Sequence, residues 1–175
     1  MTIREDCIVE IYTGDEDSFS VGKVCFQNHD SVVFYSIDEQ GKIAGYYAMK
    51  KNYITKILDN TEYLHKIDKY MEYGENNPYT SWFSLKKVEF DISKPLFTQI
   101  LRYAKENDII VTLDVFSSDY LETGYVREIT QEKIVLECVN VGNAQMMDKV
   151  SIEIESIAFI EFESIDNRLL QYANS

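Results

Sequence analysis

The sequence is poor in the residues that cross-link or interrupt a chain. Its 175 residues include two prolines, seven glycines, one tryptophan and three cysteines. The cysteines, Cys7, Cys25 and Cys138, are odd in number and contain no C-x-x-C spacing, which argues against a disulfide framework and against a zinc site. This cysteine usage predicts a reducing, cytoplasmic location.

Long apolar runs are also missing from the sequence. No stretch approaches the roughly 18–20 apolar residues that a membrane span needs. The first ten residues, MTIREDCIVE, carry acids where a signal peptide has its basic region. We therefore expect a protein that neither crosses a membrane nor binds one.

Basic residues are few in comparison with acidic ones. The sequence has seventeen lysines and arginines and thirty aspartates and glutamates, which gives a net charge of −13. From residue 111 to the end, twelve acids face four bases, a net charge of −8. Such a surface repels phosphate backbones, whose neutralisation supplies most non-specific nucleic-acid affinity. The charge thus disfavours nucleic acid without excluding it, and it favours a basic protein partner.

Apolar and aromatic residues, in contrast, are plentiful and arranged in an internal repeat. They make up 45% and 13% of the chain, enough for packed cores. Four pairs of residues are each separated by 102 positions: Gly22 and Gly124, Val24 and Val126, Val32 and Ile134, Phe34 and Leu136. Further matches are Val9-Glu10-Ile11 with Val111-Thr112-Leu113 and, shifted by one more residue, Ile54 and Ile57 with Ile157 and Ile160. The repeat predicts two copies of one small domain.

The first copy reads as five short strands followed by a helix. Apolar and β-branched patterning predicts strands over 7–12, 19–26, 32–37, 46–50 and 54–58. A bend or bulge is expected around Gly22 in the second strand. A helix should begin at the capping residue Asp59 and present Tyr63, Leu64, Ile67, Tyr70 and Met71 on one face. The stretch 73–81 should break regular structure, and 82–90 is either a strand or a connector.

The second copy reads as a helix followed by five strands. Ser93 is expected to cap the helix, with Pro95 in its first turn and an apolar face of Leu96, Phe97, Ile100, Leu101 and Ala104. Strands are predicted over 109–116, 121–129, 133–139, 148–155 and 157–162, then a short closing helix over 165–172. The predicted domains are residues 1–75 and 93–175, joined by a linker over 76–92.

This arrangement resembles the Sm-like (Lsm) fold, an SH3-like barrel, and in particular the bacterial Sm-like RNA chaperones. In those chaperones the pattern is a glycine, an aliphatic residue two positions later, an aromatic residue at five, which is Gln27 or Ile129 here, and aliphatic residues at ten and twelve. Gly22, Val24, Val32 and Phe34 stand at the other positions, as do their equivalents in the second copy. The aspartate that those chaperones have six positions after the glycine is Asn28 here and Thr130 in the second copy. The resemblance implies a mainly β chain with short helices, built as two tandem five-stranded Sm-like barrels.

The same resemblance points to one nucleic-acid site. The chaperones contact RNA through a basic, histidine-containing segment before an I-S-x-I step, and residues 49–57, MKKNYITKI, are similar to it. Lys51 is kept and Asn52 stands in place of the histidine, whereas the second copy is acidic in this region. The implied RNA-contacting residues are Lys50, Lys51, Asn52, Tyr53 and Lys56. The alternative is an edge strand whose lysines discourage pairing with another chain.

No motif in the sequence indicates catalysis, a cofactor or a metal. His29 and His65 read as surface residues, and neither shares a recognisable motif with a cysteine. The acids 15–17 lack the spacing of a calcium loop. Glu161 and Glu163 are expected to alternate on a strand and to mark a solvated face. We therefore predict that the chain is not an enzyme.

Charge and composition together favour a function in binding. The leading prediction is an acidic protein-interaction module, of inhibitor or immunity type, that binds a basic protein. Its many tyrosines, several of them near residues 70–79, suit a protein-binding surface. Sm-like proteins form rings, so this chain could also associate with copies of itself. The alternative prediction is an RNA-binding Sm-like protein.

Overall fold

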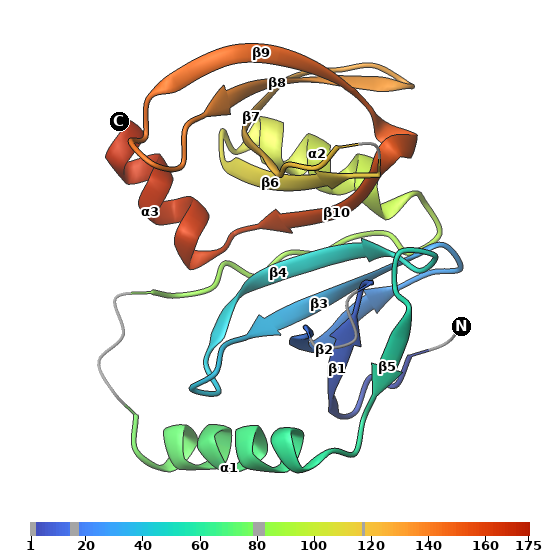
Figure 1. Cartoon of the computed structure of the whole chain (residues 1–175), viewed down its shortest axis with the longest axis vertical. Helices are drawn as coiled ribbons and strands as arrows, with labels where there is room; N and C mark the ends of the chain where they lie inside the picture. The colour runs from blue at the N-terminus through green and yellow to red at the C-terminus, as the bar shows by residue number, and fades with distance from the viewer. Residues whose placement is uncertain (1–2, 15–17, 79–82, 117) are drawn as a thin grey trace. The chain divides into compact units, whose positions relative to one another are not determined.

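The computed structural model describes residues 3–14, 18–78, 83–116 and 118–175. The chain is mainly β, with three α-helices, and divides into two compact units, Met1–Lys87 and Val88–Ser175 (Figure 1). The point of division lies within the predicted linker, residues 76–92. The acids 15–17, considered above as a cation site, lie outside the described residues.

Unit 1 contains five strands followed by one helix. Its elements are β1 (Ile8–Tyr12), β2 (Ser20–Gln27), β3 (Ser31–Ile37), β4 (Ile43–Lys50), β5 (Lys56–Leu58) and α1 (Glu62–Asn76). Unit 2 adds a helix before its five strands. Its elements are α2 (Leu96–Glu106), β6 (Ile110–Val115), β7 (Glu122–Ile129), β8 (Lys133–Val139), β9 (Met146–Glu153), a 3₁₀ turn η1 (Ile154–Ser156), β10 (Ile157–Phe162) and α3 (Ile165–Asn174).

The two units have the same strand order. In unit 1 the first strand pairs with the second and the fifth, and the third and fourth follow, which gives β5-β1-β2-β3-β4. In unit 2 the corresponding order is β10-β6-β7-β8-β9. All these pairings are antiparallel. Within the described part of each unit they run as an open series, so the predicted closure into two barrels is not confirmed.

The repeat is kept residue by residue in the strand register. Val9 lies opposite Gly22, and 102 positions later Val111 lies opposite Gly124. The second strand of each unit contains a β-bulge three residues after its glycine, between Val24 and Phe26 in β2 and at the equivalent place in β7. A bulge bends a strand and increases its twist. The predicted bend is therefore present, but it lies beyond the glycine and not at it.

Gly22 and Gly124 allow the second and third strands of each unit to approach closely. A β-carbon on Gly22 would lie 2.9 Å from the β-carbon of Phe34, and one on Gly124 would lie 2.2 Å from the carbonyl oxygen of Glu137. Real β-carbons do not approach backbone atoms so closely, so an added methyl group would have to displace the neighbouring strand. Neither glycine has a positive φ angle. The equivalent position of these glycines in the two units thus reflects packing of the second strand on the third.

The helix that follows the fifth strand also belongs to the repeat. Thr61 and Ser164, which are 103 positions apart, cap α1 and α3 by accepting hydrogen bonds from the amides of Leu64 and Asn167. The predicted cap at Asp59 is wrong, because Thr61 is the N-cap residue and its hydroxyl accepts from the amide of Leu64. Each unit therefore consists of five strands and a helix, and α2 is the addition in unit 2.

The apolar cores confirm most of the predicted faces. In unit 1, Leu64 and Ile67 of α1 pack with Ile8, Val21 and Ile37 of the sheet. In unit 2, all five residues of the predicted α2 face are buried. Along β9 and η1, Ile152 and Ile154 are buried between exposed neighbours, as the alternating pattern predicts.

Two local predictions are wrong, and one open alternative is decided. Helix α1 continues through Gly74 to Asn76, because the glycine lies in the exposed last turns, where it costs only about 1 kcal/mol. Residues 83–90 form no strand, which agrees with the alternative of a connector. Ser93 does not cap α2: its hydroxyl donates to Asp91 Oδ1 at 2.6 Å, and Pro95 occupies the N-cap position.

Candidate functional site

The predicted RNA-contacting segment lies in unit 1, from the end of β4 through the following turn to the start of β5. Lys51 is held against the protein, since its ammonium donates to the carbonyl oxygen of Asn28 at 2.7 Å and to Oε1 of Gln27 at 3.2 Å. Burial lowers the pKa of Lys51 below its usual value. Two of the three ammonium protons of this lysine thus serve to tie the turn to the β2–β3 connection.

The other members of this segment are arranged along the same turn. The ammonium of Lys56 lies 4.9 Å from the centroid of the Tyr12 ring, within the range of a cation–π contact. The amide of Tyr53 donates to the carbonyl oxygen of Lys50, and Asn52 is exposed. The structure brings the five predicted residues together, and RNA binding by them stays a prediction.

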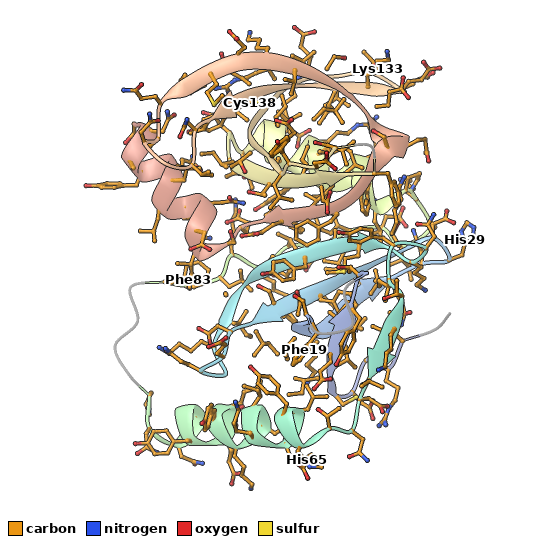
Figure 2. All side chains as sticks on the ribbon, in the orientation of Figure 1. Phe19, His29, His65, Phe83, Lys133 and Cys138 are labelled. Carbon is orange, nitrogen blue, oxygen red and sulfur yellow. The ribbon has the colours of Figure 1, made fainter. Side chains whose placement is uncertain are left out.

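The histidines and cysteines lie apart from one another. His29 pairs with Asp30 at 2.8 Å and His65 contacts Asn60, both on the outside of unit 1 (Figure 2). Burial raises the pKa of the Cys25 thiol to about 12 and that of Cys138 to about 11, which leaves both thiols protonated and weakly nucleophilic at neutral pH. In the described part of the chain, no cluster of three or more histidine, cysteine or carboxylate side chains could hold a metal ion.

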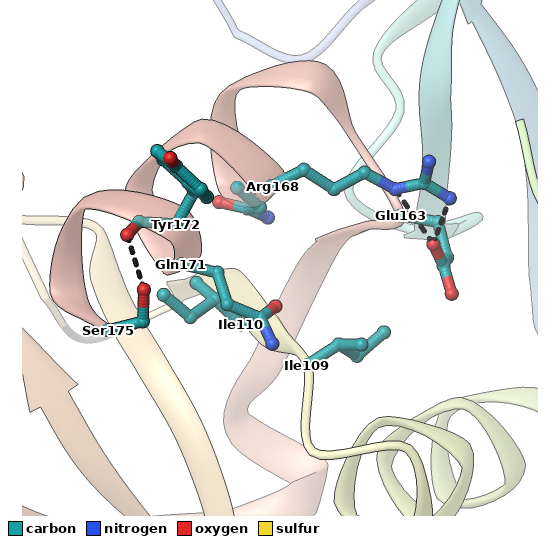
Figure 3. Close-up of a pocket in the computed structure, with 8 residues that line it drawn as sticks. Ile109, Ile110, Glu163, Arg168, Gln171, Tyr172 and Ser175 are labelled. Atoms are coloured by element: carbon teal, nitrogen blue, oxygen red, sulfur yellow. Dashed lines mark hydrogen bonds and ion pairs between the residues drawn. The ribbon is translucent and has the colours of Figure 1, made fainter. Parts of the chain in front are cut away.

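Helix α3 has a cavity of about 380 Å³ on the side of Ile109 and Ile110 (Figure 3). Its charged groups are engaged with one another. Glu163 accepts from the Arg168 guanidinium at 2.6 Å and from the Tyr103 hydroxyl at 2.5 Å. Gln171 donates to the carbonyl oxygen of Asp108. These contacts attach α3 to the rest of unit 2, and we regard this cavity as structural.

A larger concave surface lies on another side of α3. Two cavities of about 720 and 390 Å³ both include Leu121, Thr123 and Val141 in their walls, so they lie next to each other. We call the surface formed by Leu121, Thr123, Val141, Glu161, Asp166 and Leu169 the α3 groove. It extends from the start of β7 and the β8–β9 connection to the outer face of α3.

The walls of the α3 groove expose aliphatic side chains. Val141 is 73% exposed, Leu121 59% and Leu169 49%, and Met147 at the far end is 54% exposed. Single exposed apolar residues are ordinary, but several around one concavity are typical of a binding surface. This is the largest of the cavities described here and the one with the most exposed aliphatic walls.

The charged side chains along the α3 groove all carry the same sign. Four carboxylates line its two cavities: Glu122, Asp148, Glu161 and Asp166. Among the described residues of these walls there is no lysine, arginine or histidine. The groove therefore combines aliphatic contact area with a negative potential, which attracts a cationic, partly apolar ligand.

A polar network forms the floor of the α3 groove. The hydroxyl of Thr112 donates to Oδ1 of Asn167 at 3.0 Å and lies 3.0 Å from the hydroxyl of Thr123. The side-chain Nδ2 of Asn167 donates to the backbone carbonyl oxygen of Glu161 at 3.2 Å. Because these buried groups satisfy each other, the network fixes α3 at a constant position beside the sheet.

Glu161 and Glu163 do not mark a solvated face, contrary to the prediction. The strand β10 ends at Phe162, and Glu163 has a positive φ angle of 50°, so the two side chains point to different surroundings. Glu163 is buried against Arg168, whereas Glu161 lines the α3 groove. Burial is the main cause that raises the pKa of Glu161, Asp166 adds to it, and a hydrogen bond from Ser164 opposes it.

The sequence analysis does not identify the α3 groove, because its walls come from segments far apart in the chain. One usable signal was present: at positions equivalent by the repeat, Tyr63 is replaced by Asp166 and Leu64 by Asn167. Loss of apolar residues from one face of a repeated helix indicates a changed surface. Of the tyrosines near residues 70–79, Tyr70 and Tyr73 are exposed on α1, and Tyr79 lies outside the described residues.

None of the helices in the described ranges combines the length and apolarity that crossing a bilayer requires. Comparison of the chain with family models, curated proteins and solved structures finds no match.

Proposed function

We propose that this chain is a non-catalytic binding protein that recognises a basic protein partner through an acidic surface. We further propose that its two units are duplicated small barrels of the Sm-like type. The shared strand order, the equivalent bulges and the equivalent helix caps support a duplication. The function would then depend on the positions at which unit 2 differs from unit 1.

The observation that carries this proposal is the composition of the α3 groove. It joins exposed aliphatic side chains to four carboxylates without a cation along its described walls. Unit 2 as a whole holds sixteen acidic and seven basic residues, a net charge of −9. A field of this sign increases the rate at which a basic partner arrives, and desolvated aliphatic contacts then slow its dissociation.

The partner class that best fits this surface is an enzyme that acts on nucleic acid. Such enzymes carry basic patches because they must hold a phosphate backbone. An acidic protein that covers the patch would block substrate binding, which is how an inhibitor or immunity-type protein works. The acidic groove supports this partner class through charge alone.

The test is to recover the partner from the native cytosol on the full-length chain and to rebuild the complex from purified components. We expect a basic protein whose affinity for this chain falls by about tenfold or more between low and high salt, since charge contributes to binding. A rebuilt complex with an acidic partner, or one unaffected by salt, would contradict the proposal. The solution mass of the chain alone shows whether it also associates with itself.

A further inference from the structure

Unit 1 has a cavity at the place equivalent to the α3 groove, so the same place can be compared in the two units. That cavity, of about 460 Å³, is lined by Phe19, Val21, Ile37 and Tyr63 among others. The equivalent residues of unit 2, 102 or 103 positions later, are Leu121, Thr123, Val139 and Asp166. All four line the cavities of the α3 groove.

In unit 1 two aromatic side chains, Phe19 and Tyr63, form part of the wall of this cavity. The rings of Phe19 and Tyr63 meet edge to face, with centroids 5.1 Å apart and planes at 83°. The ammonium of Lys66 lies 4.1 Å from the centroid of the Tyr63 ring. Unit 1 therefore places a pair of aromatic rings and a cation between its second strand and its helix.

In unit 2 the same three positions have lost both the rings and the cation. Leu121 replaces Phe19, Asp166 replaces Tyr63 and Leu169 replaces Lys66. Leu121 is 59% exposed, Leu169 is 49% exposed, and Asp166 is exposed. The cavity beside α3 is correspondingly larger, about 720 Å³. Unit 2 thus has more open space at the place where two aromatic rings line the smaller cavity of unit 1.

We propose that the α3 groove binds a peptide segment of the protein partner that carries an aromatic side chain next to a lysine or arginine. This inference rests on the proposed function, and it specifies which chemistry of the partner is recognised. The aromatic ring would lie against Leu121, Val141 and Leu169. The neighbouring cation would face Asp166, at the position equivalent to Tyr63, and Glu161, since both carboxylates line the larger cavity.

Charge explains why the cation must come from the partner. Glu161 is partly buried, and a carboxylate in such a place keeps its charge more easily when a cation approaches. Asp166 lies in the first turn of α3 and adds a second negative charge. A purely apolar segment would leave both carboxylates desolvated without a counter-ion, which is unfavourable. An aromatic side chain alone is therefore a weaker ligand than an aromatic side chain beside a cation.

The experiment uses the isotopically labelled full-length chain and three short synthetic peptides, with amide chemical shifts as the readout. The first peptide has a central tryptophan flanked by lysines in an otherwise alanine and serine sequence. The second replaces tryptophan by alanine, and the third replaces the lysines by glutamates. We expect the first peptide to shift the amides of Leu121, Val141 and Leu169, and to bind at least about tenfold more tightly than the other two. Equal binding of all three, or shifts only outside the groove, would overturn the inference.

A variant that copies unit 1 tests the groove directly. Leu121→Phe combined with Asp166→Tyr introduces the two rings of unit 1, and we expect it to narrow the groove and to weaken binding of the first peptide by at least about tenfold. Glu132→Tyr is the matched control, because it removes one exposed carboxylate and adds one ring outside the groove. We expect the control to bind the first peptide as the unaltered chain does. Undiminished binding by the double variant, with the amide spectrum of a folded chain, would contradict the inference.

The two proposals can fail separately. If the rebuilt complex with the basic partner keeps its affinity in the double variant, the groove is not the binding site and the inference fails, while the proposed function stands. If the first peptide binds in the groove but no basic protein forms a salt-sensitive complex, the proposed function fails and the recognition chemistry stands. A single-stranded oligonucleotide that shifts the same amides would contradict both.

Discussion

A β-carbon added to Gly124 would lie 2.8 Å from the Cα atom of Cys138, its partner across the β7–β8 ladder. The same carbon would lie 2.2 Å from the carbonyl oxygen of Glu137. Both contacts are with backbone, which cannot rotate away as a side chain can. The glycine is thus required by the approach of one strand to another, and the repeat keeps it for this reason.

The first prediction concerns this glycine. We expect Gly124→Ala to lower the free energy of unfolding by about 1–3 kcal/mol, because the methyl group forces β7 and β8 apart. The loss should be smaller for Gly22→Ala, whose nearest contact is a side-chain atom at 2.9 Å. Urea unfolding followed by circular dichroism measures both. Gly142→Ala, where the added carbon would meet only a side-chain oxygen at 3.2 Å, is the control.

The second prediction concerns the floor of the α3 groove. Asn167→Ala removes the acceptor of the Thr112 hydroxyl and the donor to the Glu161 carbonyl, so we expect a loss of about 1–3 kcal/mol in unfolding free energy. Asn167→Leu with Thr112→Val and Thr123→Val replaces all three hydrogen-bonding side chains by apolar ones, as Leu64 and Val21 of unit 1 do at two of the equivalent positions. This triple variant should be less destabilised than Asn167→Ala in the same urea titration. An equal or larger loss in the triple variant would contradict this expectation.

The third prediction is a pH dependence due to Glu161. Burial raises the pKa of this carboxyl in the folded chain above its ordinary value of 4.5, so in this range the folded state binds more protons than the unfolded state. The contribution of Glu161 to stability therefore falls as the pH rises from 4.5 through the raised pKa. Glu161→Gln should remove this fall and should be the more stable chain at neutral pH. Urea unfolding of both chains at a series of pH values gives the difference.

The groups around Glu161 support the upward direction of its pKa shift. Asp166 on α3 also raises the pKa of Glu161, and only the hydrogen bond from Ser164 lowers it. Across β10, its partner in the ladder is Thr112, which is uncharged. If Glu161→Gln left the slope of stability against pH unchanged, the carboxyl would have to be solvated in the folded chain.

The fourth prediction addresses RNA binding. We expect single-stranded oligonucleotides to bind this chain weakly or not at all in low salt, because the net charge of −13 opposes them and Lys51 already donates to Asn28 and Gln27. Fluorescence anisotropy measures the binding. Tight binding that weakens steeply with salt and is lost in Lys50→Glu with Lys51→Glu would favour the alternative of an RNA-binding protein.

Much of the fold could be predicted from the sequence. The strands over 133–139 and 157–162 are found with the predicted bounds, and the α2 face from Leu96 to Ala104 is buried as predicted. These segments have a strong periodicity, and burial of apolar side chains decides their structure. The helix caps at Thr61 and Ser164 were less predictable, since several neighbouring residues can accept a hydrogen bond from a helix amide.

The candidate site could not be predicted in the same way. Glu161 and Glu163 look alike in the sequence, yet a turn with positive φ after Phe162 sends one into the groove and buries the other against Arg168. Lys51 looks like an available cation, and its ammonium is instead engaged with the β2–β3 connection. Such outcomes depend on which distant segments meet, and local pattern carries no information about that.

The sequence by itself determined the matching residue spacing in the two units, their mainly β composition and the negative charge, because residue spacing and charge are properties of the chain alone. Only the tertiary structure decided that Leu121, Val141, Asp166 and Leu169 surround one groove while Phe19 and Tyr63 line its smaller counterpart. The reason is physical. A cavity is formed by side chains from several elements at fixed distances, and those distances exist only after the sheet and the helix have packed together.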